Sequence, residues 1–172
     1  NKKDKEFSSQ EINALFGFLS SVNDSNFLYV KDNKDVLIKI IGEENYKMVI
    51  NRVLMMDVFQ KSLDLKTQTI NDEFFITEVS KLISKEEALA MLNAVKMNFY
   101  PSVGNFVEYE KVALSTLKNG ENVNISDLVK AANIFNQYIT NKSSLEKATI
   151  WAEKIVMMQD TFEATSLMAQ LY

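Results

Sequence analysis

The chain contains no cysteine and no histidine among its 172 residues, and only one proline and four glycines. Without these side chains it can form no disulfide bond, no zinc site built from cysteine or histidine, no cysteine nucleophile and no histidine-based catalytic triad. Four scattered glycines cannot build a glycine-rich phosphate-binding loop, and so few turn residues argue against a β-sandwich or barrel. We therefore expect no enzyme, no metal and no cofactor.

An excess of positive charge is also lacking. The sequence has 19 Lys and Arg against 23 Asp and Glu, for a net charge of −4, and Arg52 is the only arginine. Nucleic-acid binding requires a concentrated positive surface, and spanning a bilayer requires about 20 consecutive apolar residues. Neither pattern is present, so we expect no nucleic-acid partner and no membrane insertion.

The length supports one domain with a single core. Lysines and acids are mixed in residues 1–7, where we expect a disordered leader, and residues 8–172 are expected to form a single helical domain. A possible seam lies at residues 66–72, because Lys66-Thr67-Gln68-Thr69 offers no apolar side chain. The chain starts with Asn1, which suggests a processed or excised segment of a longer protein.

The spacing of apolar residues predicts helices joined by short links along nearly the whole chain. Ser8-x-x-Glu11 is a capping box that is expected to start a helix running through Val22. Gly42 is expected to stop a helix as a left-handed cap, and the next helix, through about Leu65, is apolar on several sides and central to the packing. The predicted helices start near residues 8, 34, 43, 72, 84, 103, 124, 143 and 160.

Four polar motifs set the starts of the later helices. They are the capping boxes Ser84-x-x-Glu87 and Ser143-x-x-Glu146 and the pairs Asn124 with Asp127 and Asp160 with Glu163. Short links favour antiparallel neighbours. The predicted fold class is all-α, with stacked antiparallel helical hairpins arranged as a bundle or a short α-solenoid and ending in a tetratricopeptide-like pair.

The acidic side chains offer few candidates for chemistry. Glu43-Glu44 and Glu86-Glu87 lie at predicted helix N-termini, where negative charge offsets the helix dipole. Glu108 and Glu110 point to different sides of one helix. Asp57 lies in a very apolar segment and needs a partner if it is buried, with Arg52 and Lys61 as candidates. We favour a solvent-facing ion pair for Asp57 over a functional acid.

The eight methionines include the pairs Met55-Met56 and Met157-Met158. Methionine-rich surfaces can bind varied partners, but methionine at helical spacing more often fills a core. Phe74-Phe75 and Phe99-Tyr100 are open to the same two interpretations, an apolar pocket or a core. We favour the core for both groups.

The C-terminal end carries the only motif-like spacing. Small Ala148 and Ala152 let one helix approach another closely, while Trp151, Phe162 and Leu167 are expected to fill the space around them. This alternation is typical of a tetratricopeptide hairpin, although any tight helical hairpin needs the same volumes. We expect Trp151 to lie between the last two helices.

The same end resembles the helical C-terminal region of Bacteroidetes thioredoxin-family proteins. The residues that carry this resemblance are Leu145-x-x-Ala148-x-x-Trp151-Ala152-x-Lys154, Asp160-Thr161 and residues 164–172. Three earlier stretches of the chain are similar to the start of that region. They are Asp24-Ser25-Asn26-Phe27-x-Tyr29, Asn33-Lys34 and Ile41-Gly42-Glu43-Glu44. The resemblance runs in order over residues 8–172. In that family, a catalytic thioredoxin domain precedes a helical, tetratricopeptide-like region.

The resemblance implies an accessory domain beside a redox or other exported domain, in the periplasm or cell envelope. The redox-active Cys-x-x-Cys of the family is absent, so no catalytic residue carries over. We expect a non-catalytic interaction or scaffold domain that presents a groove or concave face to a protein partner or adjacent domain. The alternative is a small-molecule module with an apolar cavity among Met and Phe side chains. The sequence nominates no catalytic, cofactor, metal or binding residue.

Overall fold

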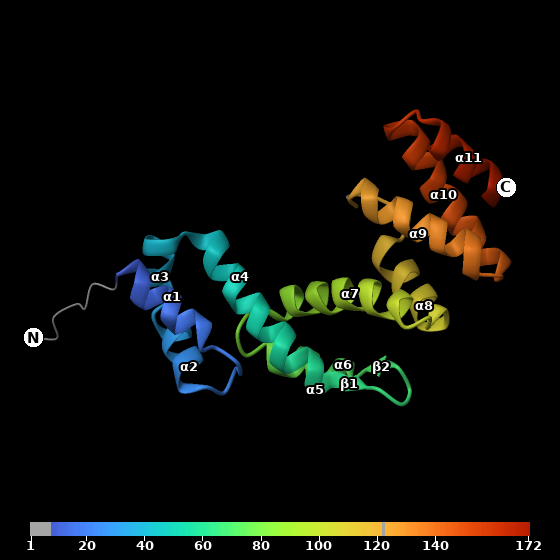
Figure 1. Ribbon diagram of the computed structural model, residues 1–172. Coiled ribbons are helices and arrows are strands. Elements are labelled where there is room, and N and C mark those ends of the chain that lie inside the picture. Colours follow the sequence, from blue (N-terminus) through green and yellow to red (C-terminus); the bar gives the residue numbers. More distant parts are fainter. Residues whose placement is uncertain (1–7, 122) are drawn as a thin grey trace, which may run out of the picture. The chain divides into compact units, whose positions relative to one another are not determined.

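A computed structural model describes residues 8–121 and 123–172, with the backbone alone for Ser9 and Asn13 (Figure 1). The expected leader over residues 1–7 lies outside the described residues. The fold is all-α, as the sequence predicted, and the described strands form only a two-stranded sheet. Every described helix is too short or too polar to cross a lipid bilayer.

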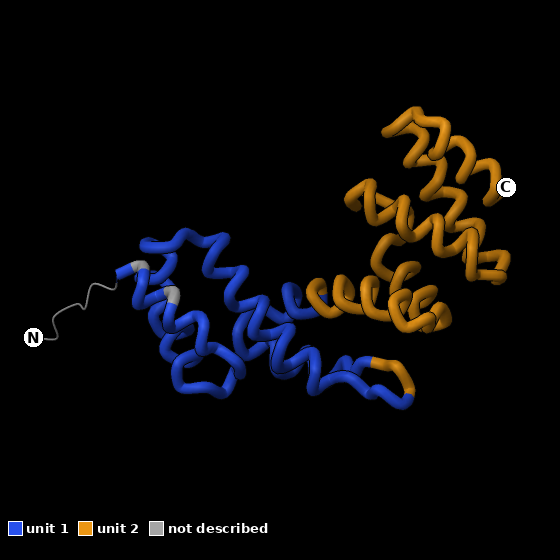
Figure 2. Tube along the Cα trace, viewed as in Figure 1, with its two compact units in different colours: residues 1–66, 70–89 blue, residues 67–69, 90–172 orange. Residues whose placement is uncertain are grey.

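The described residues divide into two compact units (Figure 2). The first unit comprises residues 8–66 and 70–89, and the second comprises residues 67–69 and 90–172. The chain passes from the first unit to the second within α7 (Lys85–Ser102). The division thus runs through the 66–72 segment and again between residues 89 and 90.

The first unit is built from short helices around one long helical segment. Helix α4 passes directly into η1 and then into α5, and Figure 1 shows the ribbon between the labels α4 and α5 as one continuous helical segment. A π-helix, η1, forms the middle of this segment and packs against α6. The elements are α1 (Ser9–Gly17), α2 (Ser25–Asp32), α3 (Lys34–Ile41), α4 (Glu43–Val53), η1 (Leu54–Phe59), α5 (Gln60–Ser62), β1 (Leu63–Asp64), β2 (Thr69–Ile70) and α6 (Asp72–Val79).

Local polar signals place the starts of these helices. The Ser8 capping box is formed as predicted, with the Glu11 backbone N–H donating to Ser8 Oγ at 3.3 Å. The helix ends at Gly17, however, and not at Val22. The stretch after Val22 starts a helix that the residue pattern did not predict: Asp24 accepts a hydrogen bond from the Asn26 N–H and caps α2.

Two further predictions in the first unit are confirmed in part. Gly42 ends α3 with a positive φ of 84°, but its ψ of 155° is extended, so it is not the left-handed helical cap that was expected. The helical stretch that starts at Glu43 continues to Ser62, close to the predicted Leu65. The π turn within it was not predicted, because no simple residue pattern marks one.

In the described part of the second unit, four helices follow α7: α8 (Phe106–Leu117), α9 (Ile125–Tyr138), α10 (Lys142–Met158) and α11 (Phe162–Leu171). Helix α10 packs against both α9 and α11, and α11 also contacts α9. The predicted caps at Ser84 and Asn124 are formed. Helices α10 and α11 start one or two residues away from the predicted positions. Asn141 caps α10 where Ser143 was expected, and Thr161 caps α11 where Asp160 was expected.

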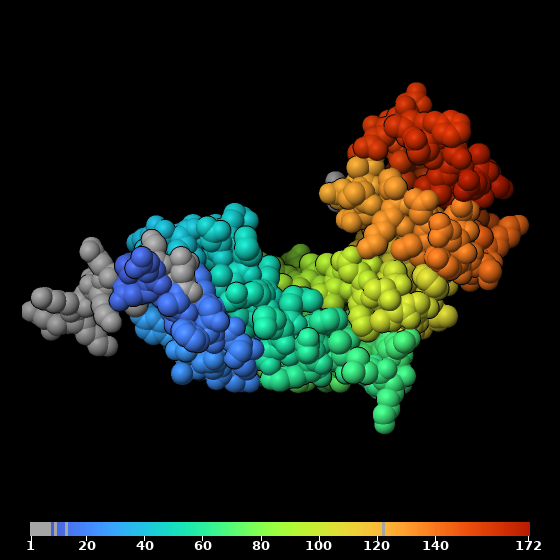
Figure 3. Space-filling model, in the orientation of Figure 1, coloured from blue at the N-terminus to red at the C-terminus, as the bar shows by residue number. Residues whose placement is uncertain are grey.

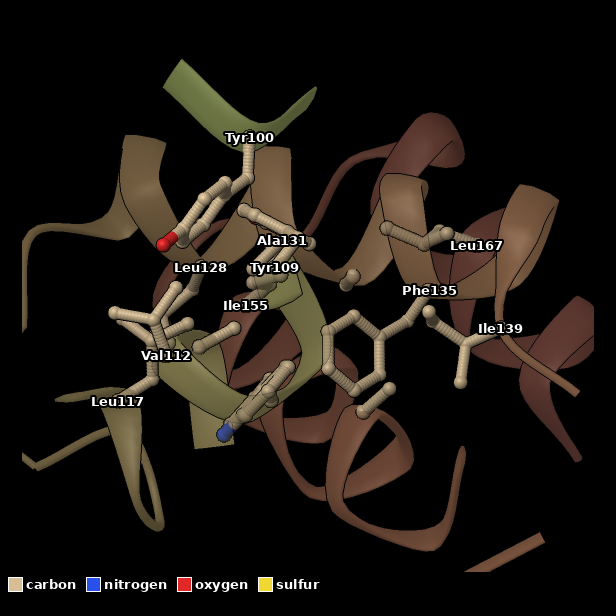
Figure 4. Close-up of a cluster of buried hydrophobic side chains, with 14 of the residues drawn as sticks. Tyr100, Tyr109, Val112, Leu117, Leu128, Ala131, Phe135, Ile139, Ile155 and Leu167 are labelled. Atoms are coloured by element: carbon tan, nitrogen blue, oxygen red, sulfur yellow. The ribbon is translucent and has the colours of Figure 1, made fainter. Parts of the chain in front are cut away.

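A buried cluster joins these helices (Figure 4). Trp151 is completely buried, with its ring edge-on to Phe135 at 4.9 Å between centroids. The indole Nε1 donates to the Lys118 carbonyl at 2.9 Å, at the end of α8. Trp151 therefore contacts α8 and α9, and it shares the buried cluster with Ala164 and Leu167 of α11. Its predicted place between the last two helices did not include the contacts with α8 and α9. Ala148 and Ala152 are completely buried, as expected of small residues at a close helix contact.

Candidate functional site

The outer face of α11 is the surface that the core does not explain. Phe162 was expected to fill space in the core, but 84% of it is exposed. At about 100° per residue, Ala169 lies almost directly above Phe162 on the same side of the helix. The buried residues Ala164 and Leu167 lie on the opposite side. Phe162 is exposed because it is the first residue of α11 and faces away from α9 and α10.

Two hydrogen bonds fix the orientation of α11 on its neighbours. On one flank, Asn136 Nδ2 of α9 donates to Gln170 Oε1 at 2.7 Å. On the other flank, the Tyr172 hydroxyl donates to Glu153 of α10. Because α11 is held on both flanks and buries Ala164 and Leu167, the side that carries Phe162 is left exposed. The C-terminal residues are the red spheres of Figure 3.

Tyr172 extends the apolar surface onto α10. It is 80% exposed, and its bond to Glu153 holds the ring beside α10. Met157 is 85% exposed and lies one turn after Glu153 on the same side of α10. Met158 is also exposed at the turn into α11. We call Met157, Met158, Phe162, Ala169 and Tyr172 the α11 surface.

Helix α11, which carries most of the α11 surface, has unusually few charged residues for an exposed helix. Glu163 is the only charged residue within Phe162–Leu171. A solvated surface helix normally presents charged and polar residues on its outer face, and exposed apolar groups that gather in one place mark interaction sites. The expectation that methionine fills the core was therefore wrong for Met157 and Met158, and it was also wrong for Met56 of the first unit, which is 54% exposed.

Asp57 of η1 is a buried acid of the first unit with several polar partners. It is 7% exposed, so the expectation that Asp57 faces solvent was wrong, whereas the predicted ion pair with Lys61 is formed. Its carboxylate accepts hydrogen bonds from Ser21 Oγ at 2.7 Å and from the Val22 N–H at 2.9 Å, and it pairs with Lys61. Burial raises the pKa of Asp57, but the hydrogen bonds from Lys61, Ser21 and Val22 outweigh it and lower the pKa below its usual value.

The hydrogen-bond and ion-pair partners of Asp57 indicate a structural role. The carboxylate is ionised and its hydrogen bonds join η1 to the link between α1 and α2. The other predicted partner, Arg52, donates instead to the Phe16 carbonyl. An open pocket of about 350 Å³ lies beside Asp57, with Lys61, Glu78 and Lys81 among its lining residues.

The other acidic candidates lie where helix electrostatics place them. Glu43, Glu44, Glu86 and Glu87 occupy first helical turns, as predicted. The hydrogen bonds from Ser84 lower the pKa of Glu87. Within the described residues, no group of three or more acids is arranged to hold a metal ion.

Glu108 and Glu110 diverge, as their spacing predicted. Lys111 pairs with Glu108, while Ser144 Oγ of α10 donates to Glu110. The two carboxylates therefore do not form one site.

A second open pocket, of about 340 Å³, lies in the second unit between α7, α8 and α9. Its lining mixes apolar with polar and charged groups, and no phenylalanine is among them. The lining residues are Ala90, Ala94, Met97, Asn98, Thr116, Leu117, Val123, Asn124, Asp127 and Lys130. This mixture differs from the apolar cavity among Met and Phe side chains that the alternative hypothesis requires.

Comparison with known proteins gave no match, whether with protein-family models, with curated proteins or with solved structures. The resemblance to thioredoxin-family helical regions therefore stays a prediction from the residues. The α11 surface was missed because Phe162 was assigned to the core by its size. The signal that could have found it is the scarcity of charge in residues 162–171.

Proposed function

We propose that the chain is a non-catalytic helical interaction module that binds a protein partner through the α11 surface. The observation that carries the proposal is the exposure of Phe162 and Tyr172 on a helix with one charged residue. Two exposed aromatic rings with neighbouring methionines offer apolar area on the order of several hundred Å², the range typical of interaction sites. A helix face, more than a groove between hairpins, is thus the proposed binding element.

Site-specific photocrosslinking tests this proposal. A benzoylphenylalanine in place of Phe162 is compared with one in place of Tyr138, a half-exposed aromatic residue of α9. We expect a discrete adduct from position 162 in the native full-length protein, and we expect the purified partner to bind wild type but not Phe162→Ser. An adduct at position 138 alone, or a partner that binds Phe162→Ser as well as wild type, would count against the α11 surface.

The biological setting is a further part of the proposal. Ala148, Trp151 and Ala152 are buried, and burial of small and large residues at this spacing supports a tetratricopeptide-like pair. The same residues carry the resemblance to thioredoxin-family proteins. We propose that the module belongs to a larger exported thioredoxin-like protein of the periplasm or cell envelope. Peptide mapping of the native gene product tests this, and a product lacking an upstream Cys-x-x-Cys would contradict it.

A small-molecule function makes a different prediction. A ligand bound to the pocket beside Met97 and Leu117 would raise the melting temperature by mass action and would be insensitive to Phe162→Ser. A thermal-shift screen with apolar compounds distinguishes the two proposals. Stabilisation by a compound in both wild type and Phe162→Ser would favour the small-molecule function.

A further inference from the structure

We propose that the partner of the α11 surface is an α-helix of another protein, with apolar residues on one side and Lys or Arg beside them. The inference rests on the proposed function, which it deepens by stating the chemistry of the partner. Two independent features support it, namely the shape of the apolar face and the distribution of charge around it.

The shape of the face suits a helix. Phe162 is the first residue of α11 and Tyr172 directly follows its last residue, Leu171. The separation of ten residues between these two positions corresponds to about 15 Å, or about three turns of a partner helix. Ala169 is small and exposed between them, with the short Thr165 and Ser166 nearby. Small residues between two large ones leave a depression into which the side-chain ridge of another helix can pack.

The charge around the face is acidic. Glu153 lies beside Tyr172, and Asp160 and Glu163 flank Phe162 at the start of α11. In residues 153–172 the one basic residue is Lys154. The Lys154 side chain lies beside Gly120, away from the α11 surface. A Cβ atom placed on Gly120 would lie 3.2 Å from the Cδ of Lys154. Complementary charge steers association and selects partners.

A second lysine of α10 points the same way as Lys154. Lys147 Nζ donates to Asn119 Oδ1 at 3.4 Å, in the link between α8 and α9. Glu146 and Glu153, in contrast, are seven residues apart and share the side of α10 that faces Tyr172. Lys147 and Lys154 thus lie on the side of α10 that faces the 118–120 link, while Glu146 and Glu153 lie on the side that faces Tyr172. Lys142, the first residue of α10, lies one turn before Glu146.

This distribution of charge favours one kind of partner for the α11 surface over the others. An anionic membrane surface or a nucleic acid would meet repulsion from Glu153, Asp160 and Glu163. A second copy of the chain, docking α11 on α11, would bring the same acids together. A helix that carries Lys or Arg beside its apolar residues meets both the apolar face and its acidic border.

The test uses two matched peptides and the whole chain. Both are labelled, leucine-faced helical peptides of about 18 residues, long enough to populate a helix, and their flanking residues are lysine in one and glutamate in the other. Binding is measured by fluorescence anisotropy at low and high salt. The proteins are wild type, Phe162→Ser, the double variant Asp160→Asn/Glu163→Gln, and the control Asp72→Asn/Glu73→Gln, which removes two acids from the start of α6.

We expect the lysine peptide to bind wild type about tenfold more tightly than the glutamate peptide at low salt, with this preference reduced at high salt. Phe162→Ser should weaken binding at least tenfold, because the ring is the proposed anchor. The Asp160/Glu163 variant should lose the lysine preference, while the Asp72/Glu73 control should keep it.

The outcomes separate the two levels of the proposal. Equal binding of both peptides, lost in Phe162→Ser, would overturn the charge inference and leave the proposed function standing. Binding that is unchanged in Phe162→Ser, or no binding at all, would overturn the helix partner at the α11 surface. Concentration-dependent dimerisation that Phe162→Ser abolishes would replace the inferred partner by a second copy.

Discussion

The carboxylate of Asp57 accepts a hydrogen bond from the backbone N–H of Val22, at 2.9 Å, across 35 positions of the sequence. This bond and the one from Ser21 fix the link between α1 and α2 against η1. A π turn widens the helix by one residue and re-aims its side chains. The buried acid in η1 is thus part of how the first unit holds its N-terminal helices.

The stability of the first unit should depend on the ionisation of Asp57. The folded-state pKa of Asp57 is lowered by its hydrogen-bond donors, although burial opposes them. The stabilisation is therefore complete above the unfolded pKa of about 4 and is lost as pH falls through the lower folded pKa. Asp57→Asn should cost about 1–3 kcal/mol at pH 7.

Urea unfolding followed by circular dichroism between about pH 6 and pH 3 checks this prediction. The difference in unfolding free energy between wild type and Asp57→Asn should shrink as the pH falls, because the wild type loses its carboxylate. A difference that stays constant over this range would show that ionisation of Asp57 does not stabilise the fold.

Gly120 should tolerate alanine less well than Gly104. Both have positive φ, 76° and 73°, so both pay a similar backbone cost of about 1 kcal/mol for a side chain. A Cβ at Gly120 would meet Lys154 and Leu128 at 3.2 and 3.3 Å, whereas none of the described atoms lies within 4 Å at Gly104. Thermal melts of the two alanine variants measure the difference, and a larger loss for Gly104→Ala would contradict this packing.

Trp151→Phe should destabilise the second unit by about 2–4 kcal/mol. The substitution leaves a space in the core and removes the indole donor from the Lys118 carbonyl. Because Trp151 is the only tryptophan, unfolding must be followed by circular dichroism. A loss below about 0.5 kcal/mol, the usual range of surface substitutions, would mean that the indole does not hold the end of α8.

Phe162 and Leu167 should respond in opposite ways to truncation, although both are large apolar residues of α11. Phe162→Ser should change the unfolding free energy by no more than about 0.5 kcal/mol, because the ring is exposed. Leu167→Ala should cost about 2–5 kcal/mol, because Leu167 is buried. A comparable large loss from Phe162→Ser would place its ring in the core after all.

The sequence predicted most of the helix starts because they depend on local chemistry. Ser8, Ser84 and Asn124 bond to N–H groups two or three residues away, so the motif and its effect lie in the same window. The Thr161 cap was missed because Asp160 beside it ranks higher than threonine as an N-cap residue. Local preference therefore pointed to the wrong one of the two neighbours.

Tertiary geometry explains what the sequence did not predict. Asp57 was expected in solvent because its partners Ser21 and Val22 lie far away in the sequence. Phe162 was expected inside because hydrophobic size alone suggests burial. Its exposure follows from the angle at which α11 packs, which Asn136 and Glu153 fix from two other helices.

The most direct test of the α11 surface is an NMR titration of the protein with methionine methyl groups labelled by ¹³C. Met157 and Met158 lie in the α11 surface, while Met48 and Met56 are comparably exposed in the first unit and serve as controls. On addition of the lysine-flanked helical peptide, we predict that the Met157 and Met158 signals shift and that the Met48 and Met56 signals do not. Shifts confined to Met48 and Met56, or no shifts at saturating peptide, would contradict the account.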